Sequence, residues 1–259
     1  MPRIKSNTSA VWGLVAAVSA ALCMPAFAAA PGPVPKIAGP NFSGMWEDPE
    51  PPEILRPPGA PPRKAQVIPP APLKEPWATQ VRQRQQEAAA ATARGETRAG
   101  GCRPGGFPGM MMPVFPIEVL QSPGQVTIVA EAFEQARRIY LDEKQIPVED
   151  AEPLFRGHSV GKWEGNTLVV NTVGLKESVR MGGAPHSANM RVDERITVTS
   201  ADTWEDQITI TDPEYLTKPW TYTIKYNRKK DYKINEFVCE DDRIEADPET
   251  GKARLRLGD

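Results

Sequence analysis

The fold is decided by the stretch Gly157-His158-Ser159-Val160-Gly161-Lys162-Trp163-Glu164-Gly165-Asn166-Thr167-Leu168-Val169-Val170-Asn171-Thr172. Two runs rich in β-branched and aromatic residues lie on either side of its Gly165-Asn166 dipeptide. A Gly-Asn dipeptide between two such runs is typical of the two-residue turn of a β-hairpin. The sequence therefore predicts antiparallel strands over 158–164 and 167–173.

The same pattern of strand, tight turn and strand continues on both sides of this hairpin. Pro123-Gly124 and Ala201-Asp202 supply two further turns. The remaining strands are expected near 115–121, 125–131, 136–142, 191–199, 203–211, 219–227 and 234–240. Short turns without intervening helices indicate an antiparallel meander, whose edges must be closed or covered. We therefore predict an all-β fold, a lipocalin-like antiparallel barrel of about 8–10 strands, with a sandwich as the alternative closure.

Composition divides the chain into five parts. We assign 1–28 to a signal peptide, 29–76 to a Pro-rich arm, 77–98 to a helix and linker, 99–244 to the barrel domain, and 245–259 to a charged tail. Because the arm holds many prolines and few apolar residues, we expect the barrel to fold without it. One run inside the arm, 41–47, could add a strand, and its Gly-x-Trp resembles the opening strand of lipocalin-type barrels. The apolar segment 107–113 is expected to plug one end of the core, with methionines at a ligand mouth as the alternative.

The N-terminus has the features of an export signal. Arg3 and Lys5 precede an apolar run over 11–24, and Ala26-Phe27-Ala28 fits the small-x-small cleavage rule. A membrane anchor is the alternative, but the run is short and proline follows it. We expect a periplasmic or secreted protein with no stable membrane insertion after cleavage.

Charge and cysteine content narrow the possible partners. Cleavage would leave 29 basic and 33 acidic residues, a net charge near −4, with no basic stripe for phosphates, so nucleic acid is not expected to bind. The remaining cysteines, Cys102 and Cys239, are expected to form a disulfide in an oxidising compartment. The alternative is a pair of metal-ligating thiols, but no CxxC motif or nearby histidine supports it.

Strand alternation identifies three polar side chains on apolar faces. Glu194 shares a face with Val192 and Ile196, Asn171 shares one with Val169 and Val173, and Asp206 lies between Trp204 and Ile208. A buried polar group without a partner costs about 1–3 kcal/mol, so these three should meet one another, a water or a ligand.

The two histidines are further candidates. His158 begins the central hairpin, and His186 ends the long loop 174–190, of a kind that often carries function. Together with Glu194, either could form an acid–base pair. The alternative is that each histidine caps a strand or satisfies a buried carbonyl. Trp163, Trp204 and Tyr222 are expected in the barrel wall, where they would line a cavity. No phosphate loop, dinucleotide fingerprint or metal-ligand spacing is present, so we expect no cofactor and no metal.

Several short motifs resemble a widespread family of secreted bacterial proteins for which no reaction is established. The motifs are Gly157–Gly165, Pro185-His186-Ser187, Asp193-Glu194-Arg195, Thr211-Asp212-Pro213, Thr217-Lys218-Pro219-Trp220 and Glu236-Phe237-Val238-Cys239-Glu240. The resemblance covers about residues 102–243. Asn166 and Asn171 stand where the family pattern has aspartates, and 175–181 lacks its usual aromatic residue. If those positions carry chemistry in relatives, this chain would differ from them.

Three functions are consistent with these observations. The first is binding of a small, largely apolar molecule in the barrel cavity. The second is a cofactor-independent isomerase, lyase or hydratase that uses Glu194, His186 and His158 in the same cavity, with Asn171 orienting the substrate. The third is a structural envelope or interaction module that uses the Pro-rich arm.

Overall fold

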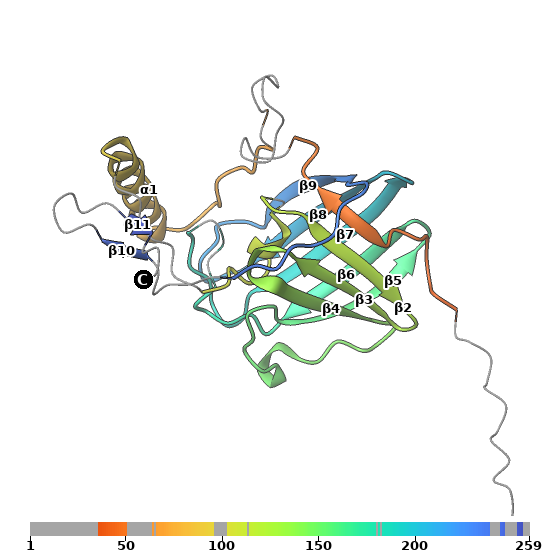
Figure 1. The fold of residues 1–259 in the computed structure, drawn as a ribbon. Coiled ribbons are helices and arrows are strands. Elements are labelled where there is room, and N and C mark those ends of the chain that lie inside the picture. The colour runs from red at the N-terminus through yellow and green to blue at the C-terminus, as the bar shows by residue number, and fades with distance from the viewer. Residues whose placement is uncertain are drawn as a thin grey trace, which may run out of the picture. The chain divides into compact units, whose positions relative to one another are not determined.

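The computed structural model describes residues 36–50, 64, 66–95, 103–112, 114–179, 181, 183–238, 244–246 and 253–255. Strands β1 to β9 form a closed barrel, as the sequence predicts (Figure 1). The predicted signal peptide and both cysteines of the predicted disulfide lie outside the described residues. Within the described ranges, we find no helix that is both long enough and apolar enough to cross a lipid bilayer.

The barrel strands follow one another in chain order around the sheet. They are β1 (Gly44–Glu47), β2 (Ile117–Ser122), β3 (Gln125–Ala130), β4 (Gln135–Leu141), β5 (His158–Glu164), β6 (Thr167–Val173), β7 (Arg191–Ser200), β8 (Thr203–Thr211) and β9 (Trp220–Arg228). The other elements are the helix α1 (Trp77–Ala93), the 3-10 turns η2 (Gly109–Met111), η3 (Ala132–Glu134) and η4 (Val148–Asp150), and the paired strands β10 (Ile244–Ala246) and β11 (Ala253–Leu255).

The central hairpin forms as predicted. Strands β5 and β6 pair antiparallel, with Glu164 opposite Thr167. Gly165 in the connecting turn has φ of 64°, a conformation that glycine adopts without strain. The Asn166 side chain donates a hydrogen bond to the carbonyl of Val198, which ties the turn to β7.

The strands are not all antiparallel, and the predicted meander is wrong at one pairing. Strand β4 pairs parallel with β5, with Ile139 opposite Ser159. A closed barrel with an odd number of sequential strands cannot alternate direction all the way round, so one neighbouring pair must be parallel. The crossover over 142–157 has the length that a parallel connection needs.

The barrel is closed by β1, which lies inside the range that we assigned to the Pro-rich arm. It pairs antiparallel with both β2 and β9. Phe42 and Trp46 are 0% exposed, and the indole of Trp46 donates to the carbonyl of Phe42. The barrel therefore begins well before residue 99, and deletion of 29–76 would remove its closing strand. The strand expected near 234–240 is also wrong over its described part, because 232–238 form no strand.

Residues 106–111 plug the barrel, as expected for this apolar segment. Phe107 and Met111 are 0% exposed, and the Tyr226 hydroxyl donates to the carbonyl of Met111. Gly106 has φ of 71°, and a Cβ there would lie 2.4 Å from the carbonyl oxygen of Phe155, so glycine is required where the plug enters. The plug carries its apolar side chains into the core of the barrel.

The last part of the arm lies against the end of the barrel where β9 begins, which we call the mouth. The indole of Trp220 donates to the carbonyl of Pro69, and the amide of Thr217 donates to that of Pro72. Leu73 forms a bridge with Leu216. Helix α1 follows directly, and its Trp77 ring packs 5.2 Å from that of Tyr215. The predicted helix is therefore confirmed and lies beside the mouth.

Candidate functional site

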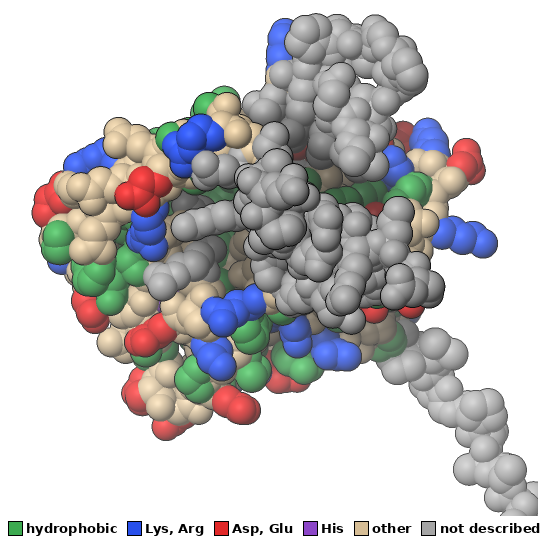
Figure 2. Space-filling view, turned by 60° about the vertical axis from the view of Figure 1, so that its left-hand side comes forward, with side chains coloured by type: hydrophobic (Ala, Val, Ile, Leu, Met, Phe, Trp, Pro, Cys, Tyr) green, Lys and Arg blue, Asp and Glu red, His purple; other side chains and the backbone are tan. Residues whose placement is uncertain are grey.

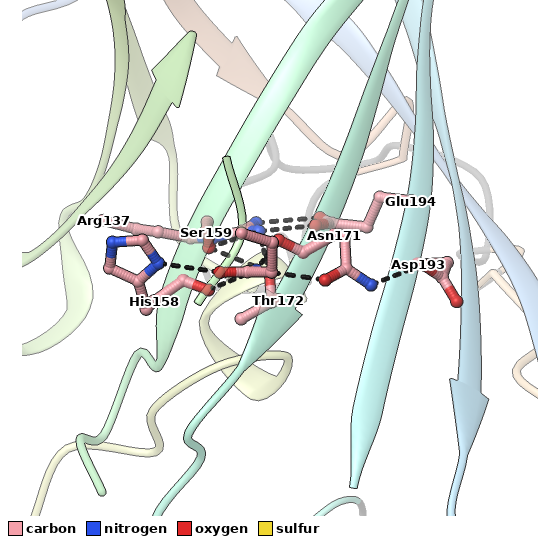
Figure 3. Close-up of polar contacts among 8 residues, drawn as sticks. Arg137, His158, Ser159, Asn171, Thr172, Asp193 and Glu194 are labelled. Carbon is pink, nitrogen blue, oxygen red and sulfur yellow. Dashed lines mark hydrogen bonds and ion pairs between the residues drawn. The ribbon is translucent and has the colours of Figure 1, made fainter. Parts of the chain in front are cut away.

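A buried ion pair crosses the inside of the barrel. Glu194 on β7 points inward, as its apolar row predicts, and is 0% exposed. The guanidinium of Arg137 on β4 binds it with two hydrogen bonds, Nη1 to Oε1 at 2.8 Å and Nη2 to Oε2 at 2.5 Å (Figure 3). Strands β4 and β7 are not neighbours in the sheet, so the pair joins two strands that β5 and β6 separate.

The other donors of Arg137 are also satisfied. Its Nε and Nη2 donate to Ser159 Oγ, both at 3.1 Å, and Nη2 also donates to Thr172 Oγ1 at 3.0 Å. The guanidinium carbon lies 3.7 Å from the centroid of the Phe107 ring, a cation–π contact that seals the pair under the plug. Arg137 was not among the residues predicted from the sequence. It shares a face of its strand with Ile139 and Leu141, and that alternation was the available signal.

Asp206 on β8 is a second acid on the inner face. It is fully buried, and no hydrogen-bond donor among the described residues contacts either carboxyl oxygen. Because Asp206 pairs with Ile196, Glu194 is the next inward residue along β7. Burial raises the pKa of Asp206 well above its ordinary value, and the negative charge of Glu194 raises it further. The neutral acid, which can itself donate toward Glu194, is therefore the favoured form.

Two of the predicted partners of Glu194 lie on the outer face. His158 Nδ1 contacts Gln145 Oε1 at 2.9 Å, and the Gln145 amide donates to Asn171 Oδ1 at 3.0 Å. Asn171 in turn donates to Asp193, on the outside of β7 (Figure 3). The predicted inward direction of Asn171 is therefore wrong. Both rows of β6 are apolar, so alternation alone could not select the inner one.

His186 is buried but does not hydrogen-bond to Glu194 either. Its Nδ1 donates to the carbonyl of Ser187 at 2.9 Å, and its Nε2 has no partner within the described residues. Ser187 binds Asp212 through both its amide and its hydroxyl, at 2.7 and 3.0 Å. This arrangement holds the end of loop 174–190 against the start of the 212–219 turn. We expected Glu194 to reach His186, His158 or Asn171 directly or through one water, but its direct hydrogen bonds among the described residues go to Arg137.

The predicted aromatic residues lie at different levels of the barrel. Trp204 is 0% exposed and stacks on Tyr226, with ring centroids 3.9 Å apart. Trp163 packs edge-on against Phe42, which also contacts Trp204. These side chains fill the end of the barrel away from the mouth, so Trp163 and Trp204 belong to the packed core. Tyr222 lies nearer the mouth, directly after Trp220 in the inward row of β9.

An apolar pocket lies at the mouth. Its volume is about 570 Å³, and it is lined by the arm, α1, the outer side of the plug, the loop 174–190 through Met181 and Ala184, and β9. The side chains used in the argument below are Ile68, Leu73, Val81, Met112, Trp220 and Tyr222. We call this space the mouth pocket. Of the five ligand-binding residues predicted from the sequence, Tyr222 is the one that lines it. Sequence reasoning missed the lining from the arm and helix because we placed those segments outside the barrel, and it missed the rest because the plug and the loop 174–190 lack a strand pattern that would show which way their side chains point.

Tyr222 connects the mouth pocket to the buried acids. Its side chain is 7% exposed, and its hydroxyl has no hydrogen-bond partner in the described structure, although it is not fully enclosed. Burial raises the pKa of Tyr222, and the nearby carboxyl groups of Asp206 and Glu194 raise it further. The phenol therefore stays protonated and can donate or accept a hydrogen bond.

In the part of the chain that the structure describes, no cluster of three His, Cys, Asp or Glu side chains could hold a metal ion. No protein-family model matches the chain, and no curated protein matches it either.

Proposed function

We propose that this protein is exported and binds a small, largely apolar molecule in the mouth pocket. One observation carries the proposal: a pocket of about 570 Å³ with apolar side chains from five separate parts of the chain. Small-molecule sites are typically apolar clefts of about 300–1,000 Å³ with a few placed polar groups. We place the site at the mouth and not in the barrel lumen, because the plug and the core aromatic residues fill the interior.

The walls of the mouth pocket suit an apolar molecule of variable shape. Proline backbone in the arm offers no amide hydrogens to a ligand, and Met112 supplies a flexible thioether at the edge. Charged side chains of both signs are scattered over the coloured part of the face in Figure 2. This mixed surface supports a small molecule, rather than a polyanion, as the partner.

An acid–base enzyme is less well supported. The two histidines that such an enzyme would use bind Gln145 and the backbone of Ser187, and neither hydrogen-bonds to Glu194. Glu194 is held by Arg137 beneath Phe107 and does not line the mouth pocket. A substrate in the pocket would meet Tyr222 before any of these groups.

The proposal is tested by recovering the ligand from protein exported by its own cells. Native mass spectrometry and solvent extraction should show one class of small molecule bound to the wild type. Ala78→Trp should abolish it, because Ala78 lies in the pocket wall on α1 and the larger ring would fill the space. Ala90→Trp is the matched control, since Ala90 is exposed on the same helix and does not line the pocket. Equal ligand content in both variants would contradict the proposal.

A further inference from the structure

We infer that the mouth pocket selects uncharged molecules whose apolar body ends in a hydrogen-bonding oxygen, such as a ketone, ester or alcohol, held by the Tyr222 hydroxyl. This inference rests on the proposed function and specifies its ligand class. It follows from the position of Tyr222, the partners of the other polar groups around the pocket, and the charges behind it.

Tyr222 is the free polar group on the barrel side of the pocket. The other aromatic donor there, the indole of Trp220, is already bonded to the carbonyl of Pro69 at 3.0 Å. The Tyr222 hydroxyl has no hydrogen-bond partner in the described structure, and the Tyr222 side chain lines the pocket. The Trp220 and Tyr222 rings lie 5.0 Å apart at 52°, so they form two adjoining walls around that hydroxyl. A ligand oxygen placed between them would complete the hydrogen bonding of Tyr222.

The charges near Tyr222 disfavour an anionic ligand. Glu194, Ile208 and Tyr222 form one row across three neighbouring strands, and Asp206 lies beside that row. Burial and the negative charge of Glu194 both make a phenolate at Tyr222 unfavourable, and both would disfavour a ligand carboxylate at that point. The one compensating cation in this region, Arg137, already binds Glu194 with both terminal nitrogens.

The basic residue of the pocket wall does not serve as an anion receptor. Arg82 on α1 is 60% exposed and contacts Glu75 and Thr79. It lies on the helix side of the pocket, so an anion bound to it would leave Tyr222 unsatisfied. We therefore do not expect long-chain carboxylates, such as fatty acids, to be the ligands. Uncharged oxygen-bearing compounds suit both the helix side and the barrel side of the pocket.

The test uses three probes that share one ring system, with affinities for the full chain measured by equilibrium dialysis at pH 7. They are 2-acetylnaphthalene, 2-naphthoate and 2-ethylnaphthalene. We expect the ketone to bind about tenfold more tightly than either of the others, which corresponds to one well-made hydrogen bond. Tyr222→Phe should remove the advantage of the ketone over 2-ethylnaphthalene and leave 2-ethylnaphthalene binding unchanged. Because Arg82 lines the pocket, Arg82→Gln is judged by the ratio of the ketone affinity to the 2-naphthoate affinity, which should stay at about tenfold.

The outcomes separate this inference from the proposed function. Tight binding of 2-naphthoate, lost in Arg82→Gln, would overturn the inference while leaving a small-molecule pocket intact. Equal binding of all three probes would also overturn it, since no polar selection would then exist. Binding of none of them would contradict the proposed function itself. The comparison among probes on the wild type needs no variant, so it holds even if Tyr222→Phe folds poorly.

Discussion

Arg137 on β4 and Glu194 on β7 are joined by two hydrogen bonds inside the core, across the two strands that lie between them. Each side chain is at most 1% exposed, so neither charge is compensated by water. Removing one partner of such a pair leaves a buried charge and typically costs about 3–5 kcal/mol, whereas replacing both with apolar residues is often neutral or stabilising.

The ion pair gives the first prediction. Arg137→Met should lower the free energy of unfolding by about 3–5 kcal/mol, because Glu194 would lose its cation beside Asp206. Arg137→Met combined with Glu194→Leu should recover most of that loss. Urea unfolding of the wild type, both single variants and the double variant measures the coupling. Additive single losses in the double variant would contradict a direct pair.

The second prediction concerns Asp206 and pH. Its folded pKa is raised, so the folded protein holds a proton that the unfolded chain releases above its ordinary pKa of 3.8. Stability should therefore fall as the pH rises from that value toward the folded pKa, by at most about 1.4 kcal/mol per unit. Asp206→Asn mimics the neutral acid and should remove this contribution. The free energy of unfolding of Asp206→Asn should therefore exceed that of the wild type by an amount that increases from pH 4 to pH 7.

Other titratable groups face Asp206, and any of them that changes charge between pH 4 and pH 7 would add to the measured pH dependence. They are Glu194 on β7, Arg137 on β4, and Tyr222 and Tyr226 on β9. Both tyrosines have raised pKa values, so they stay neutral over this range and add no slope. A stability difference that is constant with pH would show that Asp206 titrates alike in the folded and unfolded protein.

The sequence predicted the local features of this structure, but not the contacts between strands that are distant in the chain. The hairpin of β5 and β6 was predicted to the residue because its strands and two-residue turn are local features. Strand β1 was left in the arm because prolines surround it and its partners are distant in sequence. The inward direction of Glu194 came from one apolar row. Its partner Arg137 was missed, because pairing across the barrel depends on closure and on the parallel β4–β5 step.

The third prediction tests β1. Trp46→Ala should lower the free energy of unfolding by about 3–5 kcal/mol, because the indole is 0% exposed and packs edge-on against Trp204. Val67→Ala in the same arm is the control and should change little, since Val67 is 87% exposed. Equal melting temperatures for the two variants would mean that β1 is dispensable.

The fourth prediction is the disulfide between Cys102 and Cys239, both outside the described residues. Nearby described residues converge on one surface: Gly105 and Phe133 line the same small pocket, and the Phe237 ring lies 4.7 Å from that of Phe133. Glu131 accepts a hydrogen bond from Tyr232, which holds this segment in place and helps raise the pKa of that tyrosine to about 12. Thiol titration of the denatured, unreduced protein should find no free thiol. Reduction should cost about 3–5 kcal/mol. Two reactive thiols before reduction would refute the bond.

The mouth pocket is tested most directly by a crystal structure of the protein with bound 2-acetyl-6-bromonaphthalene, in which anomalous scattering locates the bromine. The account predicts a bromine position within the pocket of Ile68, Leu73, Val81 and Trp220, with the ketone oxygen in hydrogen-bond contact with the Tyr222 hydroxyl. A bromine position elsewhere on the protein, or a ligand turned with its oxygen away from Tyr222, would contradict it.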